Sequence, residues 1–242
     1  MENIYDKNVF FDKYSKMERS KKGLSGAGEW HQFKNLLPDF NGKTVLDLGC
    51  GYGWHCKNAV DNGAILVHGI DSSEKMIEHA KKINFDSKIE YYITNINEYL
   101  YPTEAYDCVI SNLVLHYIND INSIYKKVNK TLKKDGVFIF NIEHPIFTCA
   151  VNEDWIYNKD GKPKYWPIDN YFKTGEIKTN FLDEIVIKQH HTISQILMGL
   201  LNNGFKIDSV IEPTPSEEML NIEGMADELR RPMMLIVKAI KL

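Results

Sequence analysis

The stretch TVLDLGCGYGWH, residues 44–55, decides how this chain folds. Its first part, Thr44 to Leu48, is β-branched and apolar and predicts a buried strand. Glycines follow at once at positions 49, 51 and 53, and a helical pattern begins at His55. Glycines between a strand and a helix let a ligand approach the backbone amides and the helix N-terminus. The stretch therefore predicts a ligand site at the carboxyl end of the first strand.

Around this stretch, β-rich runs alternate with helical patterns from residue 44 to 143, which is typical of βαβ units in a parallel sheet. The expected strands are TVLDLG (44–49), AILVHGI (64–70), IEYYI (89–93), YDCVISNL (106–113) and GVFIFNIE (136–143). Apolar spacing of i, i+3, i+4 predicts helices at 55–62, 73–83 and 121–132, and Asp135-Gly136 reads as the stop of the third. Each helix can cover a face of the sheet.

The flanking segments have a different character. Residues 1–40 contain two expected helices, at 8–21 and 28–37. Residues 144–190 break the alternation with prolines and glycines, yet they hold eight aromatic residues in 47 positions, or 17% against 12% for the chain. We therefore expect a packed insertion there and not a flexible linker. A helix at 192–203 and strands at 205–211 and 232–240 should follow.

Composition limits the function. Hydrophobic residues at 43% and charged residues at 26% are ordinary for a folded globular protein. The net charge of −4 offers no general attraction to a polyanion, so nucleic acid is disfavoured as the main partner. The four cysteines form no C-x-x-C pair or zinc-type spacing, which indicates a reducing, cytoplasmic setting. Since no leader pattern and no long apolar run is present, we expect neither export nor a membrane span.

Two acidic residues restrict the ligand. In the dinucleotide fingerprint the third glycine would stand at position 54, which is Trp54, and Asp47 leads the pattern D-x-G-x-G-x-G instead. An acid there repels a pyrophosphate and suits a cation. Asp71 ends the second strand, 24 residues after Asp47, where a carboxylate can accept both ribose hydroxyls. Together these residues predict a nucleoside with a cationic, unphosphorylated tail, and they oppose a nicotinamide oxidoreductase.

At this point the sequence resembles the class I S-adenosylmethionine-dependent methyltransferases. VLDLGCGYG (45–53) is similar to their first motif, GIDSSEKMI (69–77) to the second, and YDCVISNLVLHY (106–117) to the fourth-strand motif. EHPIFT (143–148), WPIDNYF (166–172) and RRPMMLI (230–236) extend the resemblance to a bacterial subgroup over nearly the whole chain. The resemblance implies an α/β Rossmann-like methyltransferase fold, with a mostly parallel seven-stranded sheet, helices on both faces and an antiparallel last strand.

The resemblance also implies a division of the chain. Residues 1–40 would form N-terminal helices that close over the cofactor, and residues 41–143 the Rossmann-like core that binds it. Residues 144–190 would be an aromatic-rich lid, and residues 191–242 would complete the core sheet.

The cofactor implied is S-adenosylmethionine, with S-adenosylhomocysteine as the product and no metal. Asp47 would face the ammonium group, Asp71 would hold the ribose and Met76 would pack on the adenine. Asn95 stands where the family commonly has an acid, and its carbonyl oxygen can still accept a hydrogen bond from the adenine amino group. The full set implied for the cofactor is Tyr14, Asp47, Gly49, Cys50, Gly51, Gly53, Asp71, Ser72, Met76, Asn95, Ile96, Ser111, Asn112 and Leu113.

Methyl transfer depends mainly on positioning, and a base helps when the acceptor is a hydroxyl or an ammonium. His116 and His144 follow the fourth and fifth strands and are the base candidates, with Glu143 and Tyr117 competing. A structural role, in which the histidine forms hydrogen bonds only within its own loop, accounts for His116 and for His144 at least as well as a catalytic role. Adjacent histidines such as His190 and His191 point in different directions, so they do not indicate a metal site. The candidates for the acceptor site are Trp155, Trp166, Tyr171 and His190.

We therefore expect a cytoplasmic, bacterial methyltransferase that acts on a small-molecule acceptor of unknown identity, without nucleic-acid or membrane partners. The alternatives are an RNA or protein methyltransferase and a non-catalytic protein that binds S-adenosylmethionine. The oligomeric state stays open, with a homodimer as one option.

Overall fold

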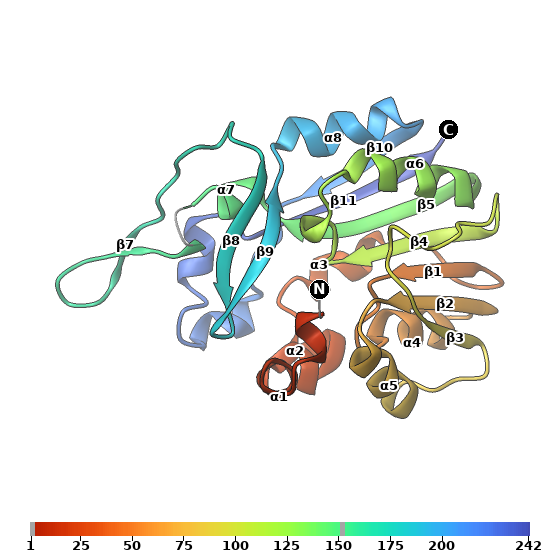
Figure 1. The fold of residues 1–242 in the computed structure, drawn as a ribbon, viewed down its shortest axis with the longest axis horizontal. Coiled ribbons are helices and arrows are strands. Elements are labelled where there is room, and N and C mark those ends of the chain that lie inside the picture. The colour runs from red at the N-terminus through yellow and green to blue at the C-terminus, as the bar shows by residue number, and fades with distance from the viewer. Residues whose placement is uncertain (1–2, 151–152) are drawn as a thin grey trace.

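A seven-stranded sheet in the order β10-β11-β5-β4-β1-β2-β3 forms the centre of the protein (Figure 1). The computed structural model describes residues 3–150 and 153–242. The strands are β1 (Thr44–Leu48), β2 (Leu66–Asp71), β3 (Ile89–Ile93), β4 (Tyr106–Asn112), β5 (Leu132–Glu143), β10 (Phe205–Ile211) and β11 (Met234–Lys241). Strands β1 to β5 pair in parallel, and β11 runs antiparallel to both β5 and β10. The predicted mostly parallel, seven-stranded Rossmann-like sheet with its antiparallel last strand is confirmed.

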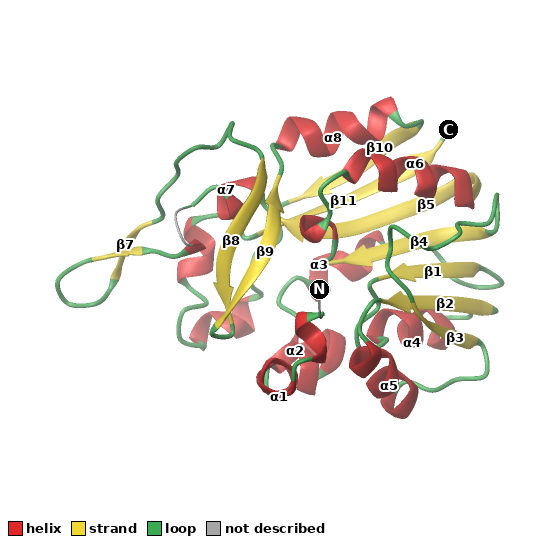
Figure 2. Cartoon of the chain, viewed as in Figure 1, coloured by secondary structure: helices red, strands yellow, loops and turns green. Residues whose placement is uncertain are grey.

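Helices cover both faces of the sheet (Figure 2). On one face lie α6 (Ile121–Thr131) and α8 (Ile193–Asn202), and on the other lie α3 (Trp30–Phe33), α4 (Trp54–Asp61) and α5 (Glu74–Ile83). The apolar spacing explains the packing, since Ile121, Ile124, Tyr125 and Val128 of α6 are all buried. Full burial of one such side chain stabilises the fold by roughly 1.5–3 kcal/mol.

Some element boundaries differ from the expected ones. Helix α6 ends at Thr131 and not at Asp135-Gly136, because Leu132 already begins β5. Residues 8–21 form two helices, α1 (Asn8–Ser15) and α2 (Glu18–Lys21), and an extended Met17 separates them. The break lets Arg19 of α2 donate to the buried Glu29 at 3.1 Å.

The insertion contains α7 (Pro145–Thr148) and two antiparallel strand pairs, β6 (Ile156–Tyr157) with β7 (Pro163–Tyr165) and β8 (Gly175–Phe181) with β9 (Glu184–His190). The tip of the second hairpin has positive φ at Leu182 and Asp183, as tight hairpin turns require. Lys13 of α1 donates to Asp183 at 2.8 Å and to the Leu182 carbonyl at 3.2 Å. Figure 1 shows α1, α2 and this hairpin on the side toward which the parallel strands point.

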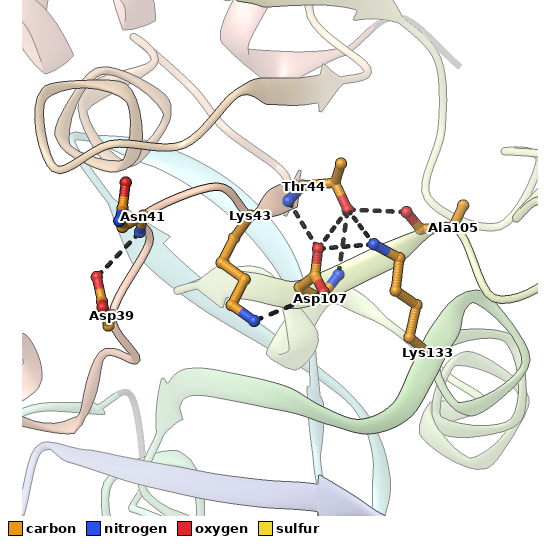
Figure 3. Close-up of polar contacts among 7 residues, drawn as sticks. All are labelled: Asp39, Asn41, Lys43, Thr44, Ala105, Asp107 and Lys133. Atoms are coloured by element: carbon orange, nitrogen blue, oxygen red, sulfur yellow. Dashed lines mark hydrogen bonds and ion pairs between the residues drawn. The ribbon is translucent and has the colours of Figure 1, made fainter.

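At the opposite edge of the sheet, Asp107 joins three adjacent strands (Figure 3). Its Oδ2 accepts hydrogen bonds from the Thr44 backbone at 2.9 Å, the Thr44 hydroxyl at 2.8 Å and Lys133 at 2.8 Å. Burial alone would raise the pKa of Asp107, but the bonds from Lys133 and Thr44 lower it below its usual value. This cluster supports the register of β1, β4 and β5 and leaves the carboxyl edge free for ligands.

Within residues 3–150 and 153–242, none of the helices combines the length and apolar character needed to traverse a bilayer.

Candidate functional site

A cavity of about 860 Å³ lies at the carboxyl edge of the sheet. The glycine turn after β1, the N-terminal helices, the ends of β4 and β5, and β9 all contribute to its lining. Its size suits a small organic ligand, for which cavities of about 300–1,000 Å³ are usual. A smaller hollow of about 370 Å³ beside Pro38 contains none of the predicted site residues. The carboxyl-edge cavity is therefore the candidate site.

The three glycines of the turn serve different purposes, although all have positive φ. A Cβ at Gly49 would overlap Val114, and one at Gly53 would overlap Tyr91, so these two glycines allow close packing of the protein on itself. At Gly51, with φ of +51°, a Cβ would meet nothing within 4 Å. Gly51 is therefore the point of the turn where a ligand can reach the backbone.

Asp71 lies beside the turn and lines the cavity. Its Oδ2 accepts from the Gly51 backbone at 3.0 Å, and its Oδ1 accepts from the Ser73 backbone at 2.9 Å. Burial raises the pKa of Asp71, and these backbone bonds oppose the rise. Each carboxylate oxygen keeps a further lone pair, so the side chain can still accept hydroxyl donors from a ligand.

Asp47 lies beneath the turn and is not part of the cavity lining. It is 1% exposed, and its Oδ2 accepts from the Cys56 thiol at 3.3 Å. Its Oδ1 has no hydrogen-bond partner among the described residues. Burial raises the pKa of Asp47 to about 7. Asp47 is therefore a buried carboxylate with an unsatisfied oxygen, directly behind the loop that would hold the ligand.

The cavity brings together most of the residues that the sequence indicated for the cofactor. The predicted residues in the lining are Tyr14, Gly49, Cys50, Gly51, Asp71, Ser72, Met76, Asn95, Ile96, Asn112 and Leu113. Gly53 and Ser111 join Asp47 outside it, and the Ser111 hydroxyl donates to the Leu48 carbonyl at 3.2 Å. Leu113 has a φ of +58°, which turns the backbone sharply at the end of β4.

The two base candidates lie in different environments. His116, in η4 (Leu115–Tyr117), is 3% exposed and lines the cavity. Its Nδ1 accepts from the Glu143 backbone at 3.5 Å, and its Nε2 lies 3.9 Å from Glu143 Oε1. Burial, with a smaller effect of the Lys188 charge, lowers the pKa of His116 well below its usual value. Burial therefore keeps His116 as a neutral ring and opposes its protonation.

His144 is fully buried outside the cavity lining. Its Nδ1 accepts from the Ile146 backbone at 3.0 Å and caps α7. Its Nε2 lies 2.9 Å from Glu212. Burial lowers the pKa of His144, and Glu212 opposes this. Both ring nitrogens thus have contacts that hold the start of α7 against the loop after β10.

The predicted acceptor residues of the insertion also lie outside the lining. Trp155 and Trp166 pack around the guanidinium of Arg231, which lies 5.4 and 4.3 Å from the two ring centres. Trp166 also donates to the Ile146 carbonyl at 3.0 Å. These rings hold the insertion against the segment before β11.

Tyr171 and His190 join the insertion to α7 and α8. The Tyr171 hydroxyl accepts from the Ile193 backbone at 3.1 Å. His190 donates from Nε2 to the Tyr171 carbonyl at 2.8 Å, so its Nδ1 accepts from the Thr148 hydroxyl at 2.6 Å. The insertion reaches the cavity instead through the second hairpin, which supplies Phe181, Ile185, Val186, Ile187 and Lys188.

Several lining residues were not indicated by the sequence. Lys188 of β9 is 4% exposed and donates to Glu143 at 2.7 Å and to Glu153 at 2.9 Å. Burial lowers the pKa of Lys188, but the two carboxylates outweigh it and raise the value. Tyr5 lies 3.0 Å, hydroxyl to hydroxyl, from Tyr117. Glu143, by contrast, was indicated by the sequence as a competing base candidate, and like Asp71 it is an acid at the end of an apolar strand. Lys188 has no such signal in its alternating strand.

No group of three or more histidine, cysteine or acidic side chains suited to a metal ion occurs among the residues that the structure describes.

Comparison with known proteins gives the family. The family described as "Methyltransferase domain" matches residues 46–140. A solved structure assigned as an S-adenosylmethionine-dependent methyltransferase from Listeria monocytogenes is 47% identical, with a TM-score of 0.87 over 91% of this chain and 99% of the other. An S-adenosylmethionine-dependent methyltransferase from Mesorhizobium loti is 36% identical, with a TM-score of 0.83 over 90% of this chain and 100% of the other.

An uncharacterized protein of Haemophilus influenzae is 30% identical over 99% of this chain and 97% of its own length. Similarity thus extends far beyond the motifs around the cavity and includes the insertion. The chain belongs to the class I S-adenosylmethionine-dependent methyltransferase family.

Proposed function

We propose that this methyltransferase acts on a small-molecule acceptor, which binds in the same cavity as the cofactor. The observation that carries the proposal is that the cavity is covered. The second hairpin of the insertion contributes to its lining. Lys7 and Lys13 of the N-terminal segment form hydrogen bonds with the tip of this hairpin. Such a cover leaves room for a compact ligand. The net charge of −4 also favours a small molecule over RNA.

The residues present fit S-adenosylmethionine. Gly51 has open space where a Cβ would stand, and Asp71 keeps lone pairs for the ribose hydroxyls. Met76 and Ile96 would contact the adenine, Asn95 would accept from its amino group, and the backbone around Leu113 would meet the methionine end. When bound, the cofactor would supply an electrophilic methyl group. The contact of Asp47 with the ammonium group stays a prediction, since Asp47 lies behind the turn.

We propose His116 as the general base. It lines the cavity, its Nε2 makes no hydrogen bond among the described residues, and its lowered pKa keeps it neutral near pH 7. Glu143 beside it can stabilise the protonated ring. His144 is a weaker candidate because both of its nitrogens already have contacts. We also propose a cytoplasmic location in a bacterium, to which the four free, buried cysteines are suited.

Calorimetry with S-adenosylmethionine and S-adenosylhomocysteine tests the cofactor site. Asp71→Ala should lower the affinity for both at least tenfold, since each lost hydrogen bond to a charged group is worth roughly 1.5–3 kcal/mol. Asp61→Ala, which changes an exposed acid paired with Lys57, should leave the affinity unchanged. Unchanged binding by Asp71→Ala would show that this carboxylate does not hold the ribose.

A labelling experiment tests the acceptor class. The protein is incubated with radiolabelled S-adenosylmethionine and with a metabolite extract, total RNA or a protein extract. We expect label only in the metabolite fraction. Label in RNA or protein would replace the small-molecule proposal, and tight cofactor binding without label in any fraction would favour a non-catalytic binding protein.

A further inference from the structure

The acceptor end of the cavity contains a cluster of four buried ionisable side chains from distant parts of the chain. His116 of η4, Glu143 at the end of β5, Glu153 of the insertion and Lys188 of β9 have side chains that are 3%, 12%, 6% and 4% exposed. His116, Glu143 and Lys188 line the cavity. Hereafter we call these four residues the acidic cluster.

In the acidic cluster two carboxyl groups share one ammonium, and burial raises the pKa of Glu143 and raises that of Glu153 to about 7. Lys188 pairs with both Glu143 and Glu153, so one ammonium faces two carboxylates. His116 adds no positive charge because burial lowers its pKa. His191 is close enough for its charge to act on His116, but burial lowers the pKa of His191 as well, so it adds no positive charge. An excess buried charge is strongly unfavourable without a counter-ion, so the cluster needs one more cation or proton.

One carboxylate oxygen without a hydrogen-bond donor in the described part of the chain indicates where that cation would bind. Glu143 Oε1 accepts from Lys188, whereas Glu143 Oε2 is buried with no hydrogen-bond partner among the described residues. His116 Nε2, on a side chain that is almost fully buried, likewise has only the 3.9 Å contact with Glu143. Both groups belong to the cavity lining, whereas Glu153 does not. Two polar atoms without hydrogen bonds among the described residues thus belong to residues that line the cavity over β5, and Glu143 Oε2 is itself covered by neighbouring atoms.

We propose that the methyl acceptor is an amine, which presents its ammonium group to the free Glu143 oxygen and lays an apolar body against the second hairpin. This inference rests on the proposed function. The ammonium supplies the missing positive charge and the missing donors, and His116 can take the proton that the nitrogen must lose before it has a free lone pair. Phe181, Ile185 and Val186 supply the apolar wall.

The cofactor carries two other cations that could face Glu143, its ammonium group and its sulfonium. Strand β4 separates β5 from β1 and its glycine turn, so Glu143 lies on the far side of the edge from Gly51. S-adenosylhomocysteine keeps the ammonium group but has no sulfonium charge, so in the protein saturated with this product the cofactor's ammonium is already placed and the sulfonium is absent.

The experiment is calorimetry on the full chain saturated with S-adenosylhomocysteine, using two matched sets of probes. One set is hexylamine, 1-hexanol and hexanoate, and the other is 2-phenylethylamine, 2-phenylethanol and phenylacetate. In at least one set we expect the amine to bind about tenfold or more tightly than the alcohol and the acid. Glu143→Gln should reduce that preference to less than about threefold, since it removes the charge but keeps the shape. Glu104→Gln, at an acid paired with Lys241 on the opposite edge, should keep it.

Equal binding of amine and alcohol in both sets would overturn the inference, and so would an amine preference that survives in Glu143→Gln. Weaker binding of S-adenosylmethionine relative to S-adenosylhomocysteine in Glu143→Gln, with no amine preference in the parent, would assign the carboxylate to the sulfonium instead. The wild-type probes decide the question even if the variant does not fold. If S-adenosylhomocysteine itself fails to bind, the proposed function fails first, and the calorimetry shows this separately.

Discussion

The two halves of the cavity are built in different ways. The half proposed for the cofactor comes from consecutive βα units, in which the glycine turn, Asp71, Met76 and Asn95 lie within residues 49–95. The half proposed for the acceptor combines His116, Glu143 and Lys188 with Tyr5 from the other end of the chain. A site made from one continuous segment can be recognised by its spacing. A site made where distant elements meet depends on packing, which spacing does not record.

Two buried acids, Asp47 behind the glycine turn and Glu143 in the cavity lining, also differ from each other. Asp47 at the end of β1 has no ion pair among the described residues, and burial raises its pKa to about 7. Glu143 at the end of β5 has Lys188 at 2.7 Å, and burial raises its pKa against the opposing effect of that lysine. Asp47 can lose its charge near neutral pH, whereas Glu143 has Lys188 as an ion-pair partner. The following predictions test this difference.

Lys188→Met should have the largest effect. It leaves Glu143 and Glu153 buried without their cation, which costs about 3–5 kcal/mol of unfolding free energy at pH 7. Urea unfolding measures the loss, which should shrink at pH 5 as the carboxylates protonate. Lys13→Met is the matched control, because its partner Asp183 is 83% exposed, and it should cost less than about 1 kcal/mol. Equal costs for both variants would contradict the buried cluster.

Asp47→Asn should change how stability depends on pH. The folded-state pKa of Asp47 lies above the unfolded value, so its contribution is present below about pH 4 and is lost as the pH rises through about 7. The cofactor-free parent should therefore lose up to about 4 kcal/mol relative to Asp47→Asn between pH 4 and pH 8, from a pKa change of about three units at 1.36 kcal/mol each. Parallel stability curves for the two proteins would show that Asp47 is charged throughout.

Gly51→Val should lower cofactor affinity at least about a hundredfold, because a branched side chain would fill the open space above the turn and resist a positive φ. Gly161→Val is the matched control, since Gly161 has a φ of +75° with nothing within 4 Å of a Cβ, in the loop between β6 and β7. Both variants should lose similar stability, and only the first should lose binding in calorimetry. Similar affinities would mean that the turn does not hold the cofactor.

The smallest effect concerns the insertion. Phe181→Ala, in the cavity lining, should raise KM for the acceptor several-fold while cofactor affinity stays within about twofold, because the two ligands meet only at the methyl group. Trp166→Ala, whose ring packs on Arg231, should lower the melting temperature without this change in KM. An unchanged KM in Phe181→Ala would remove the hairpin from the acceptor site.

The local features of the fold could be predicted from the sequence. The strand, glycine turn and helix at residues 44–61 are set by neighbouring residues, and strands β3 and β10 have the predicted bounds. The predicted helix stop at Asp135-Gly136 was wrong, because Lys133, Lys134 and Asp135 resemble a helix end although β5 begins at Leu132. Leu132 pairs with Tyr106 of β4, and pairing with β4 and β11 continues from Val137 after a register shift, so the start of β5 depends on partners elsewhere in the chain.

The acceptor half was decided by tertiary structure. The sequence alone determined that an aromatic insertion leaves β5 near the carboxyl edge, and that an acid, Glu143, ends that strand. It did not show that Trp155 and Trp166 would pack on Arg231, or that Phe181 and Lys188 would reach the cavity. The reason is physical: the direction of a side chain in a strand alternates from residue to residue, so its contacts depend on where the whole hairpin docks.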